Sequence, residues 1–314
     1  MNLSIDLKEK YTRLIKTKAK QLGFSFCGIS KSEFLEEEAP RLDSYLKKKF
    51  HGNMKYLENN AEKSLDPQKL VEGSKSVISL MTNYFPKEKI PEENNYIISK
   101  YIYGKDYHIV IKNKLSELSE FICKNIGQVN LRTFVDSAPV LEKAWAAKSG
   151  LGFIGKNSIL INPNHGSFFF LSEIITDLEL FYDKPLDNYF CGNCTKCIDA
   201  CPTKAIVSPK VINPNLCISY LTKEFKENLP DFLKGKLNNI IIGCDICQDV
   251  CPFNKLSKPH KEVSFLPSLE LLKMRKSDWE NITEKEFKKL FKNTAVERMK
   301  FKNLKRNIEF NCLD

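Results

Sequence analysis

Eight of the eleven cysteines fall into a spaced pattern that is typical of iron–sulfur proteins. The first run, C-x2-C-x2-C-x3-C-P, comprises Cys191, Cys194, Cys197 and Cys201. The second run, C-x2-C-x3-C-P, comprises Cys244, Cys247 and Cys251, and Cys217 lies between the two runs. Thiolates at this spacing hold cubane clusters, and the last cysteine before each proline ligates the other cluster. The pattern therefore predicts two [4Fe-4S] clusters that pass single electrons.

Exchanging the last cysteines between the runs assigns the ligands. Cluster 1 receives Cys191, Cys194, Cys197 and Cys251, and cluster 2 receives Cys201, Cys244 and Cys247. The missing eighth ligand is one of Cys27, Cys123, Cys217 and Cys312. We assign Cys217 because it lies between the runs and closes the shortest loop. Two four-cysteine zinc sites are the alternative, since C-x2-C pairs also bind zinc.

Composition and charge indicate a globular protein with a basic end. The chain has 314 residues, a hydrophobic content of 42% and a net charge of +10. No apolar run approaches membrane-spanning length, and the lysine-rich N-terminus does not resemble a signal peptide, so we expect a cytoplasmic protein without a membrane partner. Between residues 288 and 306 the chain has eight basic residues and one acidic residue. This segment is either a solvated helix face or a surface that contacts nucleic-acid phosphates.

Hydrophobic periodicity predicts an α+β first half. A strand is expected over Ser76–Asn83, a helix over Ile109–Ile126 that stops at Gly127, and a strand over 130–135. A further helix should begin at Ser137 and end at Gly150, since Ser137 can cap it and Pro139 suits its first turn.

The stretch from Gly150 to Asn157 contains G-x-G-x-x-G and nearly matches a phosphate-binding loop. Such motifs need a preceding strand and a following helix. Here a helix is expected before the glycines and a strand, residues 158–161, after them. The glycines are therefore expected to permit close approach of backbone segments.

Several runs together resemble the epoxyqueuosine reductase family. They are the two cysteine runs, Cys217-Ile-Ser-Tyr-Leu-Thr222, Tyr103-Gly-Lys-Asp-Tyr-His108, Val135-Asp-Ser-Ala-Pro-Val-Leu-Glu-Lys-Ala144, Gly152-Phe-Ile-Gly-Lys-Asn157, Thr294-Ala-Val296 and Leu304-Lys-Arg-Asn307. These matches occur in order through most of the chain.

The resemblance implies a fold, cofactors and a substrate. It implies an α+β protein with an N-terminal cobalamin-binding α/β-sandwich-like domain (1–180) related to reductive dehalogenases, a bacterial ferredoxin-like 2×[4Fe-4S] domain (181–260) and a short basic helical tail (261–314). It implies that the protein is an oxidoreductase that reduces epoxyqueuosine to queuosine at the wobble position of tRNA, the last step of queuosine biosynthesis. An external electron donor such as flavodoxin or ferredoxin is expected, and we expect a monomer.

The resemblance also implies site residues. The proton donor would be Asp136, and cobalamin would contact Asp136, Ser99, His108, Lys156, Asn157, Ser219 and Tyr220. The anticodon stem-loop of the tRNA would contact Arg298, Lys302, Lys305 and Arg306. A carboxylate at a helix N-terminus has a lowered pKa, whereas a general acid must hold a proton near neutral pH. We therefore expect desolvation by the cofactor to raise the pKa of Asp136.

Two other functions fit part of the sequence. A reductive dehalogenase-like or other small-molecule cobalamin reductase would share the clusters and the fold but has no use for a basic tail. A simple electron-transfer protein would leave about 180 residues before the cysteines unexplained.

Overall fold

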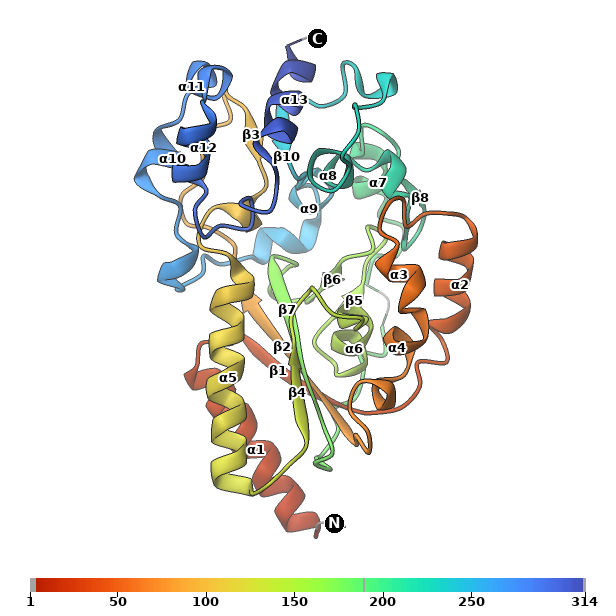
Figure 1. Ribbon diagram of the computed structural model, residues 1–314. Coiled ribbons are helices and arrows are strands. Elements are labelled where there is room, and N and C mark those ends of the chain that lie inside the picture. The colour runs from red at the N-terminus through yellow and green to blue at the C-terminus, as the bar shows by residue number, and fades with distance from the viewer. Residues whose placement is uncertain (1–3, 189, 313–314) are drawn as a thin grey trace.

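The centre of the molecule is a four-stranded antiparallel sheet with the order β1-β2-β7-β4 (Figure 1). The computed structural model describes residues 4–188 and 190–312. Its central strands are β1 (Phe26–Lys31), β2 (Ser76–Asn83), β4 (Leu131–Phe134) and β7 (Phe169–Thr176). Ser79 of β2 and Phe134 of β4 both lie opposite Glu173 of β7. The mixed architecture confirms the expected α+β class.

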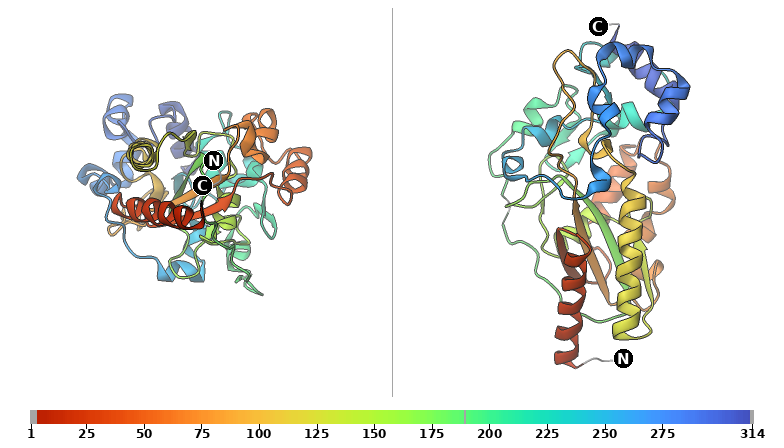
Figure 2. Two further views of the ribbon diagram at one scale, coloured as in Figure 1. Left: turned by 90° about the horizontal axis from the view of Figure 1, so that it is seen from below. Right: turned by 90° about the vertical axis from the view of Figure 1, so that its left-hand side faces the viewer.

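Helices cover both faces of this sheet (Figure 2). On one face, α1 (Ile5–Gln21) and α5 (Tyr107–Ile126) bury Ile15 and Ile111 against Ile78, Leu80 and Ile174. On the other face, α6 (Glu142–Lys148) buries Trp145 against Val77 and Ile175. Because side chains alternate along a strand, residues 77 and 78 supply opposite faces.

The sequence-based expectations for these elements are largely confirmed. The observed β2 has the expected bounds, α5 ends at Gly127, and β4 lies within 130–135. The helix expected from Ser137 is wrong at its start, since α6 begins only at Glu142. Pro139 disfavours the helical conformation at Ala138, and Asp136 has a φ of 53°. Residues 136–141 therefore form a loop before the helix.

The glycine-rich stretch forms a hairpin after α6. Strands β5 (Phe153–Ile154) and β6 (Leu160–Ile161) pair antiparallel, so no strand-loop-helix phosphate site is present in this stretch. A Cβ atom on Gly152 would lie 2.5 Å from the Ile161 carbonyl oxygen, and Gly150 has a φ of 75° beside the Lys184 carbonyl. The glycines thus allow close backbone approach, as predicted.

The cysteine module consists of short elements and long loops. They are α7 (Lys196–Ala200), β8 (Ile206–Ser208), β9 (Val211–Ile212), α8 (Ile218–Lys223), β10 (Ile240–Ile242) and α9 (Ile246–Asp249). Strand β10 pairs in parallel with β3 (Ile97–Ile98) of the N-terminal half. Nearby, the buried Lys100 Nζ lies 2.8 Å from Asp249 and 3.3 Å from Asp245. Backbone pairing and a buried ion cluster therefore attach the second cysteine run to the first half of the chain.

The C-terminal tail is helical, as expected. It comprises α10 (Leu269–Lys273), α11 (Lys276–Asn281), α12 (Glu284–Leu290) and α13 (Phe301–Asn311). Trp279, Phe287 and Leu304 of this tail belong to the same hydrophobic core as Ile15 and Ile111. The tail therefore packs on the N-terminal half, and the boundaries at 180 and 260 stay a prediction.

Short helices complete the chain. The remaining α-helices are α2 (Ala39–Lys47), α3 (Tyr56–Asn59) and α4 (Ala61–Leu65), and the 3-10 turns are η1 (Pro67–Lys69), η2 (Lys100–Ile102), η3 (Pro214–Leu216), η4 (Asp231–Leu233), η5 (Pro252–Leu256) and η6 (Val263–Phe265). Within the described part of the chain, every helix is too short or too polar to cross a membrane.

Candidate functional site

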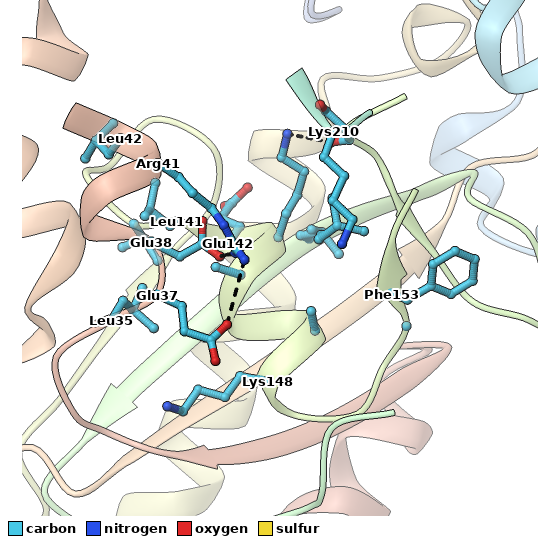
Figure 3. Close-up of a pocket in the computed structure, with 18 of the residues that line it drawn as sticks. Leu35, Glu37, Glu38, Arg41, Leu42, Leu141, Glu142, Lys148, Phe153 and Lys210 are labelled. Atoms are coloured by element: carbon cyan, nitrogen blue, oxygen red, sulfur yellow. Dashed lines mark hydrogen bonds and ion pairs between the residues drawn. The ribbon is translucent and has the colours of Figure 1, made fainter. Parts of the chain in front are cut away.

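A large pocket of about 1860 Å³ lies beside the α6 face of the central sheet. Its lining residues come from Tyr107 and from the segments 30–57, 136–154, 169–171 and 182–188, together with Ser158 and with 209–212 of the cysteine module. Figure 3 shows Glu37 and Glu38, which lead into α2, and Arg41 of α2 on one side, with Glu142 of α6 nearby. Arg41 forms ion pairs with Glu37 and Glu38. The pocket thus combines charged groups at this wall with apolar side chains such as Leu35 and Leu141.

Asp136 lines this pocket and is held by two aromatic residues of α5. Its Oδ2 atom accepts a hydrogen bond of 2.7 Å from the Tyr107 hydroxyl and lies 3.2 Å from His108 Nε2. His108 Nδ1 in turn lies 2.7 Å from Asp106 Oδ1. The His108 side chain is 5% exposed and that of Asp136 is 55% exposed, so the Asp136 carboxylate is the member of this hydrogen-bonded series that solutes can contact.

The electrostatic surroundings of Asp136 and His108 favour a charged pair, with Asp136 ionised and His108 protonated. Burial opposes ionisation of Asp136, but hydrogen bonds from His108 and Tyr107 outweigh it and lower its pKa to about 2. Burial also opposes a charge on His108, but its contacts with Asp106 and Asp136 outweigh this and raise its pKa. A protonated His108 donates from both ring nitrogens, which places a transferable proton beside the Asp136 carboxylate.

Glu142, the first residue of α6, contacts the same loop through the backbone. Its Oε1 atom accepts a hydrogen bond of 2.6 Å from the Asp136 N–H. Burial and the nearby charge of Asp136 raise the pKa of Glu142 to about 8. Beneath it, Glu173 of β7 is fully buried, and neither of its carboxyl oxygens has a hydrogen-bond partner among the described residues.

The cysteines gather in the two predicted groups. Burial and then the neighbouring Cys191 raise the pKa of Cys197, and Cys251 and Cys194 act in the same direction. In the second group, burial and then Cys217 raise the pKa of Cys244, and Cys201 adds to this. Cys247 interacts with Cys244 and Cys217, and also with Cys197 of the first group. These interactions link cysteines that the spacing assigns to the same cluster and also connect the two groups, and the ligand assignment stays a prediction.

Among residues 4–188 and 190–312, no three Cys, His, Asp or Glu side chains converge closely enough to hold a single metal ion. A cubane cluster binds its four cysteines through separate iron atoms, so its ligands lie further apart. The three cysteines outside the two groups are Cys27, Cys123 and Cys312, and both Cys123 and Cys312 are exposed.

Five of the residues predicted to bind cobalamin lie at the cysteine module, and none of the five lines the pocket. Lys156 Nζ donates to the Gly192 carbonyl (2.8 Å), and Asn157 Nδ2 donates to the Cys247 carbonyl (3.3 Å). The backbone N–H groups of Ser219 and Tyr220 hydrogen-bond to Cys217 and oppose the rise in its pKa that burial causes.

The fifth of these residues, Ser99, is buried at the start of the second cysteine run. A Cβ atom on Gly243 would lie 2.2 Å from its hydroxyl oxygen. Asp136 and His108 are therefore the two members of the predicted set that the structure brings together at the pocket.

The four basic residues predicted to contact tRNA differ in their surroundings. Arg306 donates to the carbonyls of Phe225, Glu227 and Leu221, and Lys305 Nζ donates to the Glu280 carbonyl (2.7 Å). By contrast, Lys302 is exposed, and Arg298 is 58% exposed. Arg298 Nη2 lies 3.6 Å from Asp106 Oδ2, which places the basic tail beside the Asp136 site.

The sequence reasoning did not single out Tyr107, Asp106 or Glu142 as site residues. Tyr107 and Asp106 adjoin His108 in the Tyr103–His108 run, and Glu142 lies within the Val135–Ala144 run. A predicted contact between those two runs would have identified these residues, but that contact depends on how α5 and α6 lie across the sheet.

Two family models match this chain. The model described as "4Fe-4S double cluster binding domain" matches residues 190–254, and the model described as "Epoxyqueuosine reductase QueG, DUF1730" matches residues 65–137. The first covers both cysteine runs, and the second ends just after Asp136.

Full-length relatives agree with these matches. An epoxyqueuosine reductase of Cyclobacterium marinum is 54% identical over 96% of this chain and 97% of its own length. A crystal structure of epoxyqueuosine reductase with an epoxyqueuosine-modified tRNA-Tyr stem loop superposes with a TM-score of 0.88 at 30% identity, over 96% of this chain and 80% of that one. The Bacillus subtilis enzyme, described with the catalytic loop of an aspartate swung out of its active site, has a TM-score of 0.85 at 29% identity, over 96% of this chain and 81% of that one. With a 4Fe-4S module beside a pocket and relatives that match it from end to end, this chain is an oxidoreductase and belongs to the epoxyqueuosine reductase family.

Proposed function

We propose that this chain reduces epoxyqueuosine to queuosine at the wobble position of tRNA, using two [4Fe-4S] clusters, cobalamin and Asp136 as proton donor. The observation on which the proposal depends is the Asp136 carboxylate, which lines the large pocket while its Oδ2 atom contacts Tyr107 and His108. The cysteine module contributes residues 209–212 to the same pocket, which supports an electron supply from this module to the proposed proton donor.

The pocket suits a corrin cofactor. Ligand pockets usually enclose about 300–1,000 Å³ and are mostly apolar. A volume of about 1860 Å³ is larger than a drug-sized ligand needs, and apolar side chains such as Leu141, Ile154 and Phe169 line it. When bound, cobalamin would supply a low-potential cobalt centre that reacts at carbon. Asp136 at the wall would hold it, with His108 behind the carboxylate, and Ser99, Lys156, Asn157, Ser219 and Tyr220 stay predicted contacts from the resemblance.

The two cysteine groups supply the electrons. Cluster 1 is proposed to bind Cys191, Cys194, Cys197 and Cys251, and cluster 2 to bind Cys201, Cys217, Cys244 and Cys247. The interaction between Cys197 and Cys247 supports a short path between the groups. The electrons would enter from an external donor such as a flavodoxin or a ferredoxin. The same proposal includes three packed units, residues 1–180, 181–260 and 261–314, in one monomer.

Asp136 and its neighbours supply a proton. Reducing an epoxide to an alkene consumes two electrons and two protons and releases one water. The low pKa of Asp136 means that the isolated carboxyl does not retain a proton near pH 7. His108, whose pKa is raised, lies 3.2 Å away and can pass the proton from Nε2 to Asp136 Oδ2. Desolvation of Asp136 by bound cofactor and substrate favours this transfer because it disfavours the charged carboxylate.

Turnover with a modified stem loop tests the whole proposal. Anaerobically purified protein with cobalamin and a chemical reductant should convert an epoxyqueuosine stem loop to queuosine, seen by mass spectrometry as the loss of one oxygen atom. Omitting cobalamin should abolish conversion, and an unmodified stem loop serves as the control substrate. Full conversion without cobalamin would contradict the cofactor assignment.

The basic tail is proposed to contact the phosphates of the anticodon stem. The solved relative with a stem loop supports an RNA ligand, and Arg298 extends from the tail to Asp106 beside the active site. Arg298, Lys302, Lys305 and Arg306 were all predicted contacts. Lys305 and Arg306 already donate to backbone carbonyls, so Arg298 and Lys302 are the exposed members of the set.

Neutralising Lys302 therefore tests the tRNA surface without loosening the tail. We expect Lys302→Gln to weaken stem-loop binding for any sequence and to reduce the slope of log K against log salt by about one. Binding is measured by fluorescence anisotropy across a salt series. Lys124→Gln is the matched control, because Lys124 is an exposed lysine on α5 outside the basic tail. An unchanged slope for Lys302→Gln would show that Lys302 is a solvated surface lysine that does not contact tRNA phosphates.

A further inference from the structure

Asp136 adopts a backbone conformation that non-glycine residues rarely use. Its φ of 53° lies in the left-handed region, which costs free energy for residues with a Cβ atom, although Asp tolerates it better than most. Such a conformation persists only when the surroundings hold it in place. The exposed residues 136 and 137 supply little of this support themselves, so it comes from neighbouring elements: from α5 through the Asp136 side chain and from α6 through the Asp136 backbone N–H.

Glu142 provides a contact that can hold the loop in this conformation. Its Oε1 atom accepts the Asp136 N–H at 2.6 Å, which closes a ring from residue 136 to the first residue of α6. The helix itself is firmly placed, since Trp145 is 1% exposed and packs with Val77 and Ile175 of the sheet. The backbone of the loop is therefore tied to a rigid element by this hydrogen bond.

The groups around Glu142 show that its carboxyl is built into this site. Asp136, His108 and Lys143 all influence its ionisation, and the charge of Glu142, after burial, raises the pKa of Glu173 beneath it. Three carboxyl groups this close together repel one another when ionised, so a third one is unfavourable unless it makes a specific contact. The hydrogen bond to the Asp136 N–H is the contact that distinguishes it, and it lies on the pocket side of the sheet.

We propose that Glu142 is a positioning residue, which holds Asp136 in the left-handed conformation that presents its carboxylate to Tyr107, His108 and the pocket. The inference rests on the proposed role of Asp136 as proton donor. An acceptor oxygen at position 142 is the required feature, so glutamine should replace glutamate and alanine should not. A hydrogen bond to a neutral acceptor shifts an equilibrium by about two- to tenfold, which is the decrease in correctly placed Asp136 that Glu142→Ala should cause.

Hydrogen exchange and kinetics on the full-length protein test this inference together. Glu142→Ala should accelerate amide exchange across residues 136–141 and lower kcat about two- to tenfold, with KM for the epoxyqueuosine stem loop unchanged. Glu142→Gln should keep the slow exchange and most of kcat. Glu117→Ala is the control, since Glu117 is exposed on α5 and does not line the pocket.

The outcomes separate this proposal from the one it rests on. Unchanged exchange in Glu142→Ala overturns the positioning role, whatever the activity of Asp136 variants. A normal kcat in Glu142→Ala overturns it as well if Asp136→Ala is inactive. If Asp136→Ala is itself fully active, the proton-donor role fails, while the exchange data still report whether Glu142 holds the loop.

Discussion

Asp136→Asn should lower turnover by about 10²- to 10⁴-fold, the usual loss when a general acid is removed. The asparagine keeps the size of the side chain and an oxygen that can accept from the Tyr107 hydroxyl, so the loop should stay in place. What it loses is the ability to receive the proton from His108 and pass it on. Asp136→Ala should have at least as large an effect. Single-turnover conversion of an epoxyqueuosine stem loop by the reduced enzyme measures the change.

The same samples must retain their cofactors for this result to be informative. Iron and sulfide contents of the Asp136 variants should equal those of the unchanged protein, because no proposed cluster ligand is altered. Cobalt content is measured on the same samples, because Asp136 is also a proposed cobalamin contact. Asp6→Asn is a suitable control, since Asp6 is an exposed carboxylate in α1 that does not line the pocket. Normal turnover in either Asp136 variant would remove this residue from the mechanism.

Replacing Cys217, which lies between the two cysteine runs, should remove one cluster. Two [4Fe-4S] clusters contain about eight iron atoms per chain, and Cys217→Ser should lower this to about four. Cys217 is the critical choice because it lies outside both spaced runs and was assigned by loop length alone. Its interaction with Cys201, and those of Cys244 and Cys247 with it, place it in the second group. Anaerobic iron and sulfide analysis with electron paramagnetic resonance gives the count.

Cys123→Ser is the matched control for this experiment. Cys123 is exposed on α5, outside both cysteine groups, so its replacement should leave the iron content unchanged. Loss of iron in Cys123→Ser with full iron in Cys217→Ser would move the eighth ligand away from Cys217. Zinc in place of iron in oxygen-protected protein would contradict the electron-transfer reading altogether.

Local signals were sufficient for the elements that depend on near neighbours. The apolar periodicity of α5 and its glycine stop, and the strand pattern of β2, were readable because each repeats over many residues. The cysteine grouping was also predicted from spacing, since cubane geometry constrains which thiols can meet.

The start of α6 was not readable in this way. Ser137 and Pro139 are good residues for a helix N-terminus, yet the helix begins at Glu142. A long-range arrangement overrides the local preference: Asp136 Oδ2 contacts two residues of α5, and its N–H is bonded to Glu142 Oε1. Local capping signals contain no information about contacts with another helix.

By itself, the sequence determined the electron-transfer chemistry, the α+β class and the family, because all of these depend on residue types at fixed spacing. Only the tertiary structure decided which residues surround Asp136, that Arg306 is used within the tail, and that Glu142 and the buried Glu173 lie close together beside the site. These features depend on how α5, α6 and the tail pack around one sheet. Hydrogen bonds and charge interactions across that packing change the pKa of Asp136, His108 and Glu142 in ways that no spacing in the chain reveals.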